Sequence, residues 1–162
     1  MQLLKIYYAY FSPGNTTEKV VSHIASSFQN YPVESINLTD YATRQEDYYF
    51  KENELLIIGV PAYGGRVPAP VVDALRHFTG SNTPVVLVAT YGNRDIDDTL
   101  IELKKNVIDK GFIPVGAASF VCQHTFLKEC AEGRPDEEDL KMAGEFGDKL
   151  KERLRLLVTY DA

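Results

Sequence analysis

The sequence predicts an α/β protein with a doubly wound parallel sheet of five strands and helices on both faces. Short apolar runs rich in β-branched residues alternate along the chain with segments whose apolar residues recur every three or four positions. The run at 55–60, Leu-Leu-Ile-Ile-Gly-Val, contains no polar residue, which is typical of a strand buried on both faces.

The first half of the chain supplies three strands and two helices. Strands are predicted at 3–10, 33–38 and 55–60, and a polar, tyrosine-bearing stretch separates the second from the third. The stripe of the first helix consists of Val20, Val21, Ile24 and Phe28. Pro68 and Pro70 suit the start of the second helix. The stripe of that helix consists of Val71, Val72, Leu75 and Phe78.

The second half of the chain repeats this alternation twice. Residues 84–91 and 112–121 predict the fourth and fifth strands, and Gly111 stands where glycine commonly follows a helix. The acidic residues at 136–138 indicate the start of the last helix, because carboxylates are favoured near the positive end of the helix dipole. The stripes of the two helices are Leu100, Leu103, Val107 and Ile108, then Ala143, Phe146, Leu150, Leu154 and Leu157.

Length and composition are those of one globular domain, expected to span 1–162. The net charge of -6, with no Lys/Arg-rich run, disfavours nucleic-acid binding. Cys122 and Cys130 form no C-x-x-C pair and have no second cluster, so no zinc or iron–sulfur site is expected. Two reduced thiols, no signal-peptide layout and no membrane-length apolar stretch predict a cytoplasmic protein without a membrane partner.

The turn after the first strand, residues 12–17, reads Ser-Pro-Gly-Asn-Thr-Thr and leads into a helix. Backbone N–H groups, hydroxyls and the positive end of the helix dipole at such a turn together suit a phosphate. An ordinary capped helix, with Asn15 or Thr16 as the N-cap, explains the same residues, so both interpretations stay open. The turn matches neither the P-loop nor the G-x-G-x-x-G pattern.

The loops after the third and fourth strands each combine an aromatic residue with glycine and polar groups. Residues 61–68 read Pro-Ala-Tyr-Gly-Gly-Arg-Val-Pro, where adjacent glycines let a planar ligand approach the backbone. In this loop Tyr63 can stack on a ring, and Arg66 can pair with an anion or with ring oxygens. Residues 90–95 read Thr-Tyr-Gly-Asn-Arg-Asp. With the turn at 12–17, these loops predict a site for a flat aromatic group that carries a phosphate.

On these motifs the sequence resembles the flavodoxin family. It is most similar to the flavodoxin-like domain that some proteins carry fused to a two-cluster ferredoxin. The resemblance rests on 10–17, 61–68 and 91–94, with support from 124–126 and 133–135, and it extends over essentially the whole chain. It implies the sheet order 2-1-3-4-5 for the predicted strands. No cysteine ladder follows the last helix, so an iron–sulfur partner is expected to act from another chain.

The resemblance implies FMN as the cofactor, bound by three sets of residues. The phosphate is expected on Ser12, Gly14, Asn15, Thr16 and Thr17. One side of the isoalloxazine ring is expected against Pro61, Ala62, Tyr63, Gly64, Gly65 and Arg66. The other side is expected against Thr90, Tyr91, Gly92, Asn93 and Arg94. Pro13 departs from the usual pattern, and it has no N–H to offer the phosphate.

Three further features have competing interpretations. His124 follows the fifth strand and is either a surface or capping histidine or, as the resemblance suggests, a catalytic residue beside the flavin. Arg66 is the other catalytic candidate, and with Arg94 it predicts a raised flavin potential, because positive charge stabilises the anionic reduced flavin. The acids at 95, 97 and 98 suit a helix start better than a metal site, so no metal is expected.

Two redox functions and one non-redox function fit this sequence. The first is an electron carrier that docks a redox partner protein such as a ferredoxin or a reductase. The second is an FMN-dependent NAD(P)H oxidoreductase that reduces a small acceptor such as a quinone. The third is a flavin-free interaction module. A phospho-acceptor receiver is disfavoured, because the first and third strands do not end in acids. A low-molecular-weight phosphatase is disfavoured, because no cysteine and arginine frame the first loop. Oligomeric state is left open.

Overall fold

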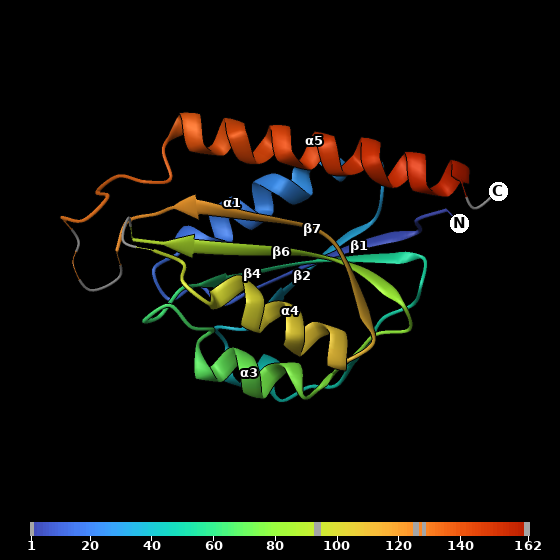
Figure 1. The fold of residues 1–162 in the computed structure, drawn as a ribbon, viewed down its shortest axis with the longest axis horizontal. Coiled ribbons are helices and arrows are strands. Elements are labelled where there is room, and N and C mark those ends of the chain that lie inside the picture. Colours follow the sequence, from blue (N-terminus) through green and yellow to red (C-terminus); the bar gives the residue numbers. More distant parts are fainter. Residues whose placement is uncertain (1, 93–94, 125–126, 128, 161–162) are drawn as a thin grey trace.

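Five parallel strands form the centre of the structure, and helices cover both faces of the sheet (Figure 1). The computed structural model describes residues 2–92, 95–124, 127 and 129–160. The strands are β1 (Lys5–Tyr10), β2 (Val33–Asn37), β4 (Glu54–Pro61), β6 (Thr83–Tyr91) and β7 (Phe112–Val121). Their order, β2-β1-β4-β6-β7, is the order 2-1-3-4-5 of the predicted strands, so the predicted fold class is confirmed.

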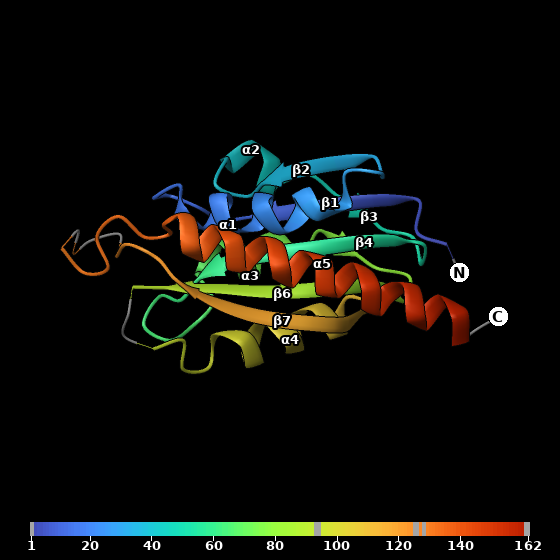
Figure 2. The same ribbon diagram turned by 90° about the horizontal axis from the view of Figure 1, so that it is seen from above.

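The main helices are divided between the two faces of the sheet (Figure 1 and Figure 2). Helix α1 (Thr16–Ala25), extended by the 3₁₀ turn η1 (Ser26–Phe28), packs beside α5 (Glu137–Tyr160). Helices α3 (Ala69–Leu75) and α4 (Thr99–Asp109) cover the opposite face. Gly111 follows α4 with a φ of 93°, as predicted for a residue that ends a helix in the left-handed region.

Each face of the sheet has its own apolar core, and β4 contributes to both. Leu55 and Ile57 pack with α1 and α5, whereas Leu56, Ile58 and Val60 pack with α3 and α4. Side chains alternate between the two faces of a strand, so a strand covered on both sides has no position for a polar residue. This alternation explains the uninterrupted apolar run in the sequence.

The tyrosine-bearing stretch between β2 and β4 contains elements that the sequence did not predict. Helix α2 (Tyr41–Arg44) begins after Asp40, whose carboxylate accepts a hydrogen bond from the Thr43 N–H. Strand β3 (Tyr48–Tyr49) pairs with β5 (Phe78–Thr79) in a second, two-stranded sheet. Phe78 is buried as predicted, but the assignment to a helix was wrong, because α3 ends at Leu75 and the chain turns into β5.

Ile108 and Leu157 belong to the apolar stripes predicted for the last two helices. Ile108 was expected on the buried stripe of α4, but it is 48% exposed, because Val107 already faces the sheet at that level. The side chain of Leu157 lies outside the described residues. Among the described residues, none of the helices combines the length and apolar character that crossing a bilayer requires.

Candidate functional site

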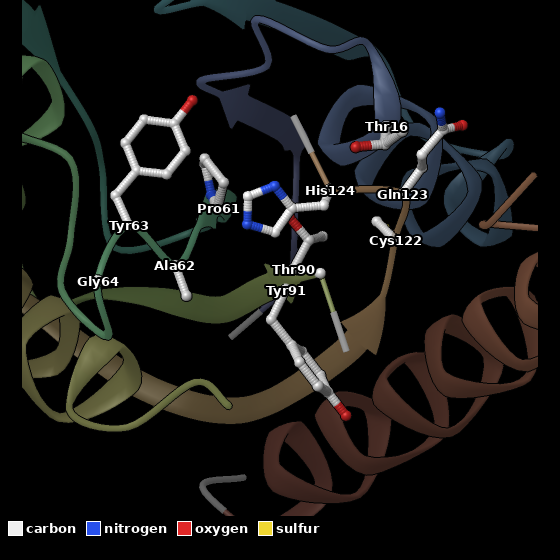
Figure 3. A pocket seen from close by; sticks show the side chains of 11 residues that line it. Thr16, Pro61, Ala62, Tyr63, Gly64, Thr90, Tyr91, Cys122, Gln123 and His124 are labelled. Atoms are coloured by element: carbon white, nitrogen blue, oxygen red, sulfur yellow. The ribbon is translucent and has the colours of Figure 1, made fainter. Parts of the chain in front are cut away.

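A cavity of about 220 Å³ lies at the carboxyl edge of the sheet, where the loops after β1, β4, β6 and β7 converge (Figure 3). All five main strands are parallel, so loops distant in sequence meet at this edge. The cavity is lined by Thr16, Pro61, Ala62, Tyr63, Gly64, Thr90, Tyr91, Gly92, Cys122, Gln123 and His124. The structure therefore brings together residues from all three of the predicted loops.

The helix cap of the first loop agrees with one predicted alternative in the position of the N-cap residue, but a different side chain makes the capping hydrogen bond. Asn15 stands at the N-cap position with a φ of 65°, but its side chain makes no capping hydrogen bond. The Ser12 hydroxyl takes that role and accepts a hydrogen bond from the Glu18 N–H at 3.0 Å. Ser12 is buried, and its own N–H donates to the Thr39 hydroxyl. The Ser12 hydroxyl is thus engaged within the protein rather than presented to the cavity.

Backbone donors remain at the start of α1. Within the described part of the chain, the N–H groups of Gly14, Thr16 and Thr17 have no hydrogen-bond partner. The Asn15 N–H, in contrast, donates to the Ser12 carbonyl at 3.1 Å. Unpaired amides at the positive end of a helix dipole form an environment that suits an anion.

The Thr17 side chain points into the protein instead of toward a ligand. Its hydroxyl lies 2.8 Å from the Thr90 hydroxyl, and both residues are 2% exposed. Thr90 lines the cavity, whereas Thr17 does not. This contact ties the first turn of α1 to the end of β6, so it helps to set the width of the cavity.

The loop after β4 folds into a tight turn that places Tyr63 and Gly64 at the cavity. Tyr63 and Arg66 exchange two backbone hydrogen bonds of 2.9 and 3.0 Å. The central residues Gly64 and Gly65 have φ values of 57° and 74°, a combination that strongly favours glycine. A Cβ on Gly64 would have no atom within 4 Å, but one on Gly65 would meet the Asp97 side chain. Gly64 therefore faces open space, and Gly65 is covered.

Arg66 does not reach the cavity. Its guanidinium pairs with the Glu102 carboxylate of α4, with Nε donating at 2.6 Å. The same carboxylate accepts a hydrogen bond from the Val67 N–H. The side chain of Arg66 is exposed on the α4 side of the turn, and Arg66 is absent from the lining residues. The structure thus separates this arginine from the ring-binding position expected for it.

The loop after β6 contributes Thr90, Tyr91 and Gly92 to the cavity. The ring of Tyr91 points away from the imidazole of His124 (Figure 3). Asn93 and Arg94, which are expected on the same side of the ring, lie outside the described residues.

Cys122 and Gln123 line the cavity but were not predicted as site residues. They follow Val121 directly, so the rule that ligands bind beyond the carboxyl ends of strands, applied to the fifth strand, was a signal for both. Burial raises the pKa of the Cys122 thiol to about 12, and a hydrogen bond with Thr16 lowers this pKa by a smaller amount. Cys122 is therefore a protonated, unreactive thiol at neutral pH.

The chain beyond β7 is anchored to α5 by an ion pair. Arg134 donates to both carboxylate oxygens of the buried Asp139, at 2.7 and 2.5 Å. These bonds, outweighing the effect of burial, lower the pKa of the Asp139 carboxyl. Asp139 and Asp136 also accept hydrogen bonds from each other's N–H, which caps the start of α5. The Arg134 carbonyl in turn accepts from the Gln123 N–H, so this anchor positions the cavity wall.

No protein-family model matches the chain, and no curated protein matches it. Solved structures do match. A flavodoxin from the domain Archaea has 15% identity, with 94% of this chain and 99% of that chain covered, and a TM-score of 0.64. Oxidised flavodoxin 1 from Bacillus cereus has 17% identity, with 91% and 97% covered, and a TM-score of 0.60.

A larger protein contains a similar region. Rubredoxin oxygen:oxidoreductase from Desulfovibrio gigas has 15% identity and a TM-score of 0.64, with 94% of this chain and 38% of that chain covered. At these identities a structural match establishes the fold. Together with the strand order, the matches show that this chain has the flavodoxin-like fold.

Proposed function

We propose that this chain binds FMN in the cavity at the carboxyl edge of the sheet and passes electrons between redox partners. The observation that carries the proposal is the convergence of the three loops. Unpaired amides at the start of α1 adjoin a cavity whose other walls are the Tyr63–Gly64 turn and the end of β6. An anion site beside a slot lined by aromatic residues and glycines suits a flat ring that carries a phosphate.

The residues present fit FMN, with some of the expected roles reassigned. The phosphate is held by the N–H groups of Gly14, Thr16 and Thr17 rather than by the Ser12 and Thr17 hydroxyls, which are engaged within the protein. Tyr63 and Gly64 flank one side of the ring, and the segment 90–92 flanks the other. Once bound, FMN supplies the redox chemistry, and the protein supplies position and electrostatics.

The open space beside Gly64 supports a further part of this role. Both residues of the 64–65 peptide are glycines, and a Cβ on Gly64 would meet no atom within 4 Å, so we propose, as the resemblance implies, that this peptide changes orientation between flavin redox states. A peptide that turns its N–H or its carbonyl toward the ring favours one flavin redox state over another.

The structural matches that are named flavodoxins support the carrier role. In this proposal the whole chain acts as one domain, and the protein is cytoplasmic. The redox partner is a protein such as a ferredoxin or a reductase, and the net charge of -6 favours a partner with a basic surface. A second candidate is an FMN-dependent NAD(P)H oxidoreductase. It is favoured by the imidazole of His124 in the cavity, where a small acceptor above the ring would contact it.

The test starts from the absorbance spectrum of the purified protein, followed by FMN titration. Tyr63→Ala is expected to weaken FMN binding about tenfold, because it removes one wall of the slot. Tyr49→Ala, which alters a tyrosine that is 73% exposed on β3, is the matched control and is expected to bind FMN like the parent. Failure of the parent protein to bind FMN would overturn the proposal. Anaerobic NADPH separates the two candidates, since only the oxidoreductase is reduced rapidly without a partner protein.

A further inference from the structure

A second cavity, of about 230 Å³, lies at the amino edge of the sheet, at the opposite end from the first. It is lined by Gln2, Leu3, Phe28, Tyr31, Lys151, Leu154 and Arg155. Leu3 precedes β1, and Phe28 and Tyr31 precede β2, so both segments lie where the parallel strands begin. The last part of α5 completes the wall, and it lies beside the start of the chain in both ribbon views (Figure 1 and Figure 2).

Most of the lining of this cavity is apolar or aromatic. Phe28 is fully buried, and Leu3 and Tyr31 pack against the same core. The rings of Phe28 and Tyr31 have centroids 6.2 Å apart and planes tilted by 56°. Such rings attract a further ring through edge and face contacts, so the lining favours an aromatic ligand. Since a cavity of about 150 Å³ can hold benzene, this one has room for a single ring with a short substituent.

The polar part of the lining is positively charged. Lys151, Leu154 and Arg155 are spaced three and four positions apart, so they lie on one face of α5. Within the described part of the chain, the partly buried Lys151 has no ion-pair or hydrogen-bond partner for its ammonium group. None of the described residues that line the cavity is Asp or Glu.

The helix dipole does not explain this pair of cations. The dipole favours positive charge within the last turn, but α5 continues to Tyr160, and its last turn contains no basic residue. A cation at the wall of an apolar cavity without a carboxylate instead favours an anionic ligand, because an ammonium group forms strong, charge-assisted hydrogen bonds with a carboxylate.

We propose that this second cavity binds a small aromatic carboxylate, with the ring of the ligand against Phe28 and Tyr31 and its carboxylate on Lys151. An apolar lining with a few polar groups that fix the orientation is the usual composition of a small-molecule site. The inference does not depend on the proposed FMN site, since the two cavities share no lining residue.

The probe is phenylacetate, and the uncharged phenylacetamide is the control ligand. Each is titrated into isotope-labelled protein, where the chemical shifts of the backbone amides report both affinity and location. We expect shift changes at 2–3, 28–31 and 151–155, and an affinity for phenylacetate about tenfold higher than for phenylacetamide. No binding of phenylacetate, equal affinity for the two ligands, or shift changes confined to 61–64 and 90–92 would overturn the inference.

Two substitutions test the role of the charge. Lys151→Gln removes the charge and is expected to weaken phenylacetate binding about tenfold, while phenylacetamide binding stays within about twofold of the parent. Lys149→Gln is the matched control, because Lys149 is exposed on α5 and does not line the cavity. Equal effects of the two substitutions on phenylacetate binding would overturn the assignment of Lys151. Both variants are expected to keep the urea unfolding midpoint and the FMN affinity of the parent, so failure of the proposed FMN site is detected separately.

Discussion

The hydroxyls of Thr17 and Thr90 lie 2.8 Å apart and are almost completely shielded from water. Thr17 belongs to the first turn of α1, and Thr90 stands near the end of β6. The two residues are separated by 73 positions in sequence, yet their contact joins the phosphate-suited turn to the opposite wall of the cavity. The same buried hydrogen bond therefore stabilises the fold and helps to set the width of the cavity.

Thr17→Val is expected to lower the free energy of unfolding by about 1–3 kcal/mol, because it leaves the buried Thr90 hydroxyl without a partner. The double variant with Thr90→Val is expected to cost less than the sum of the single variants, since it removes both polar groups. Urea unfolding measures all three variants, with the exposed Thr79→Val as the control. Strict additivity would show that the two hydroxyls are not coupled.

Asp139→Asn is expected to cost about 1–3 kcal/mol at about pH 7, because Arg134 loses its charged partner. Arg134 lowers the pKa of the folded-state Asp139 carboxyl below its ordinary value of 3.8. The stabilisation is therefore present above that value and is lost as the pH falls through the lower, folded-state pKa. Urea unfolding should show the gap between variant and parent narrowing at about pH 3. A gap that is constant with pH, or equal to that of the exposed Glu138→Gln, would contradict this assignment.

Gly92→Ala is expected to displace the His124 ring, because the new Cβ would lie 2.6 Å from Cδ2. We expect a loss of about 1 kcal/mol in stability and FMN binding that is about tenfold weaker. Gly144→Ala in α5 is a matched control, since its Cβ meets no atom within 4 Å and alanine favours a helix. Thermal unfolding and FMN titration measure the two variants. Parent-like FMN affinity in Gly92→Ala would show that the ring position does not affect the site.

Arg66→Gln is expected to leave FMN affinity within about twofold of the parent, because Glu102 holds the guanidinium outside the cavity. The same substitution should have little effect on stability, since exposed ion pairs contribute about 0–1 kcal/mol. FMN titration is the measurement, and the Tyr63→Ala protein serves as the positive control. A tenfold loss in Arg66→Gln would mean that the side chain turns into the cavity when flavin binds.

The two cysteines are expected to differ in reactivity toward a thiol reagent at mildly alkaline pH. Burial raises the pKa of the Cys122 thiol to about 12, so almost no thiolate forms there in the folded protein. Cys130 is partly exposed and is expected to react first. The Cys130→Ser protein should therefore release colour with Ellman's reagent only after denaturant is added. Rapid reaction of folded Cys130→Ser would contradict the burial of Cys122.

The sequence indicated which of its loops form the site more reliably than it indicated which side chains do. Adjacent glycines at 64 and 65, and hydroxyl and amide residues before a helix, are local signals with local physical causes. The orientation of a side chain is not a local property, because it depends on partners that are distant in sequence. Ser12 points toward the α1 amides, Thr17 toward Thr90 and Arg66 toward Glu102, and only the assembled sheet places these partners.

The sequence by itself determined the five strands, the four main helices and their alternation, because the period of apolar residues reflects the local backbone conformation and its burial. It did not predict the pairing of β3 with β5, since two-residue strands have no period to detect. The sequence indicated His124 as a candidate, but only the tertiary structure placed Cys122 and Gln123 beside it in the wall of the cavity. The physical reason is that a cavity forms only where loops from separate strands meet, and its lining depends on which hydrogen bonds those loops make with one another.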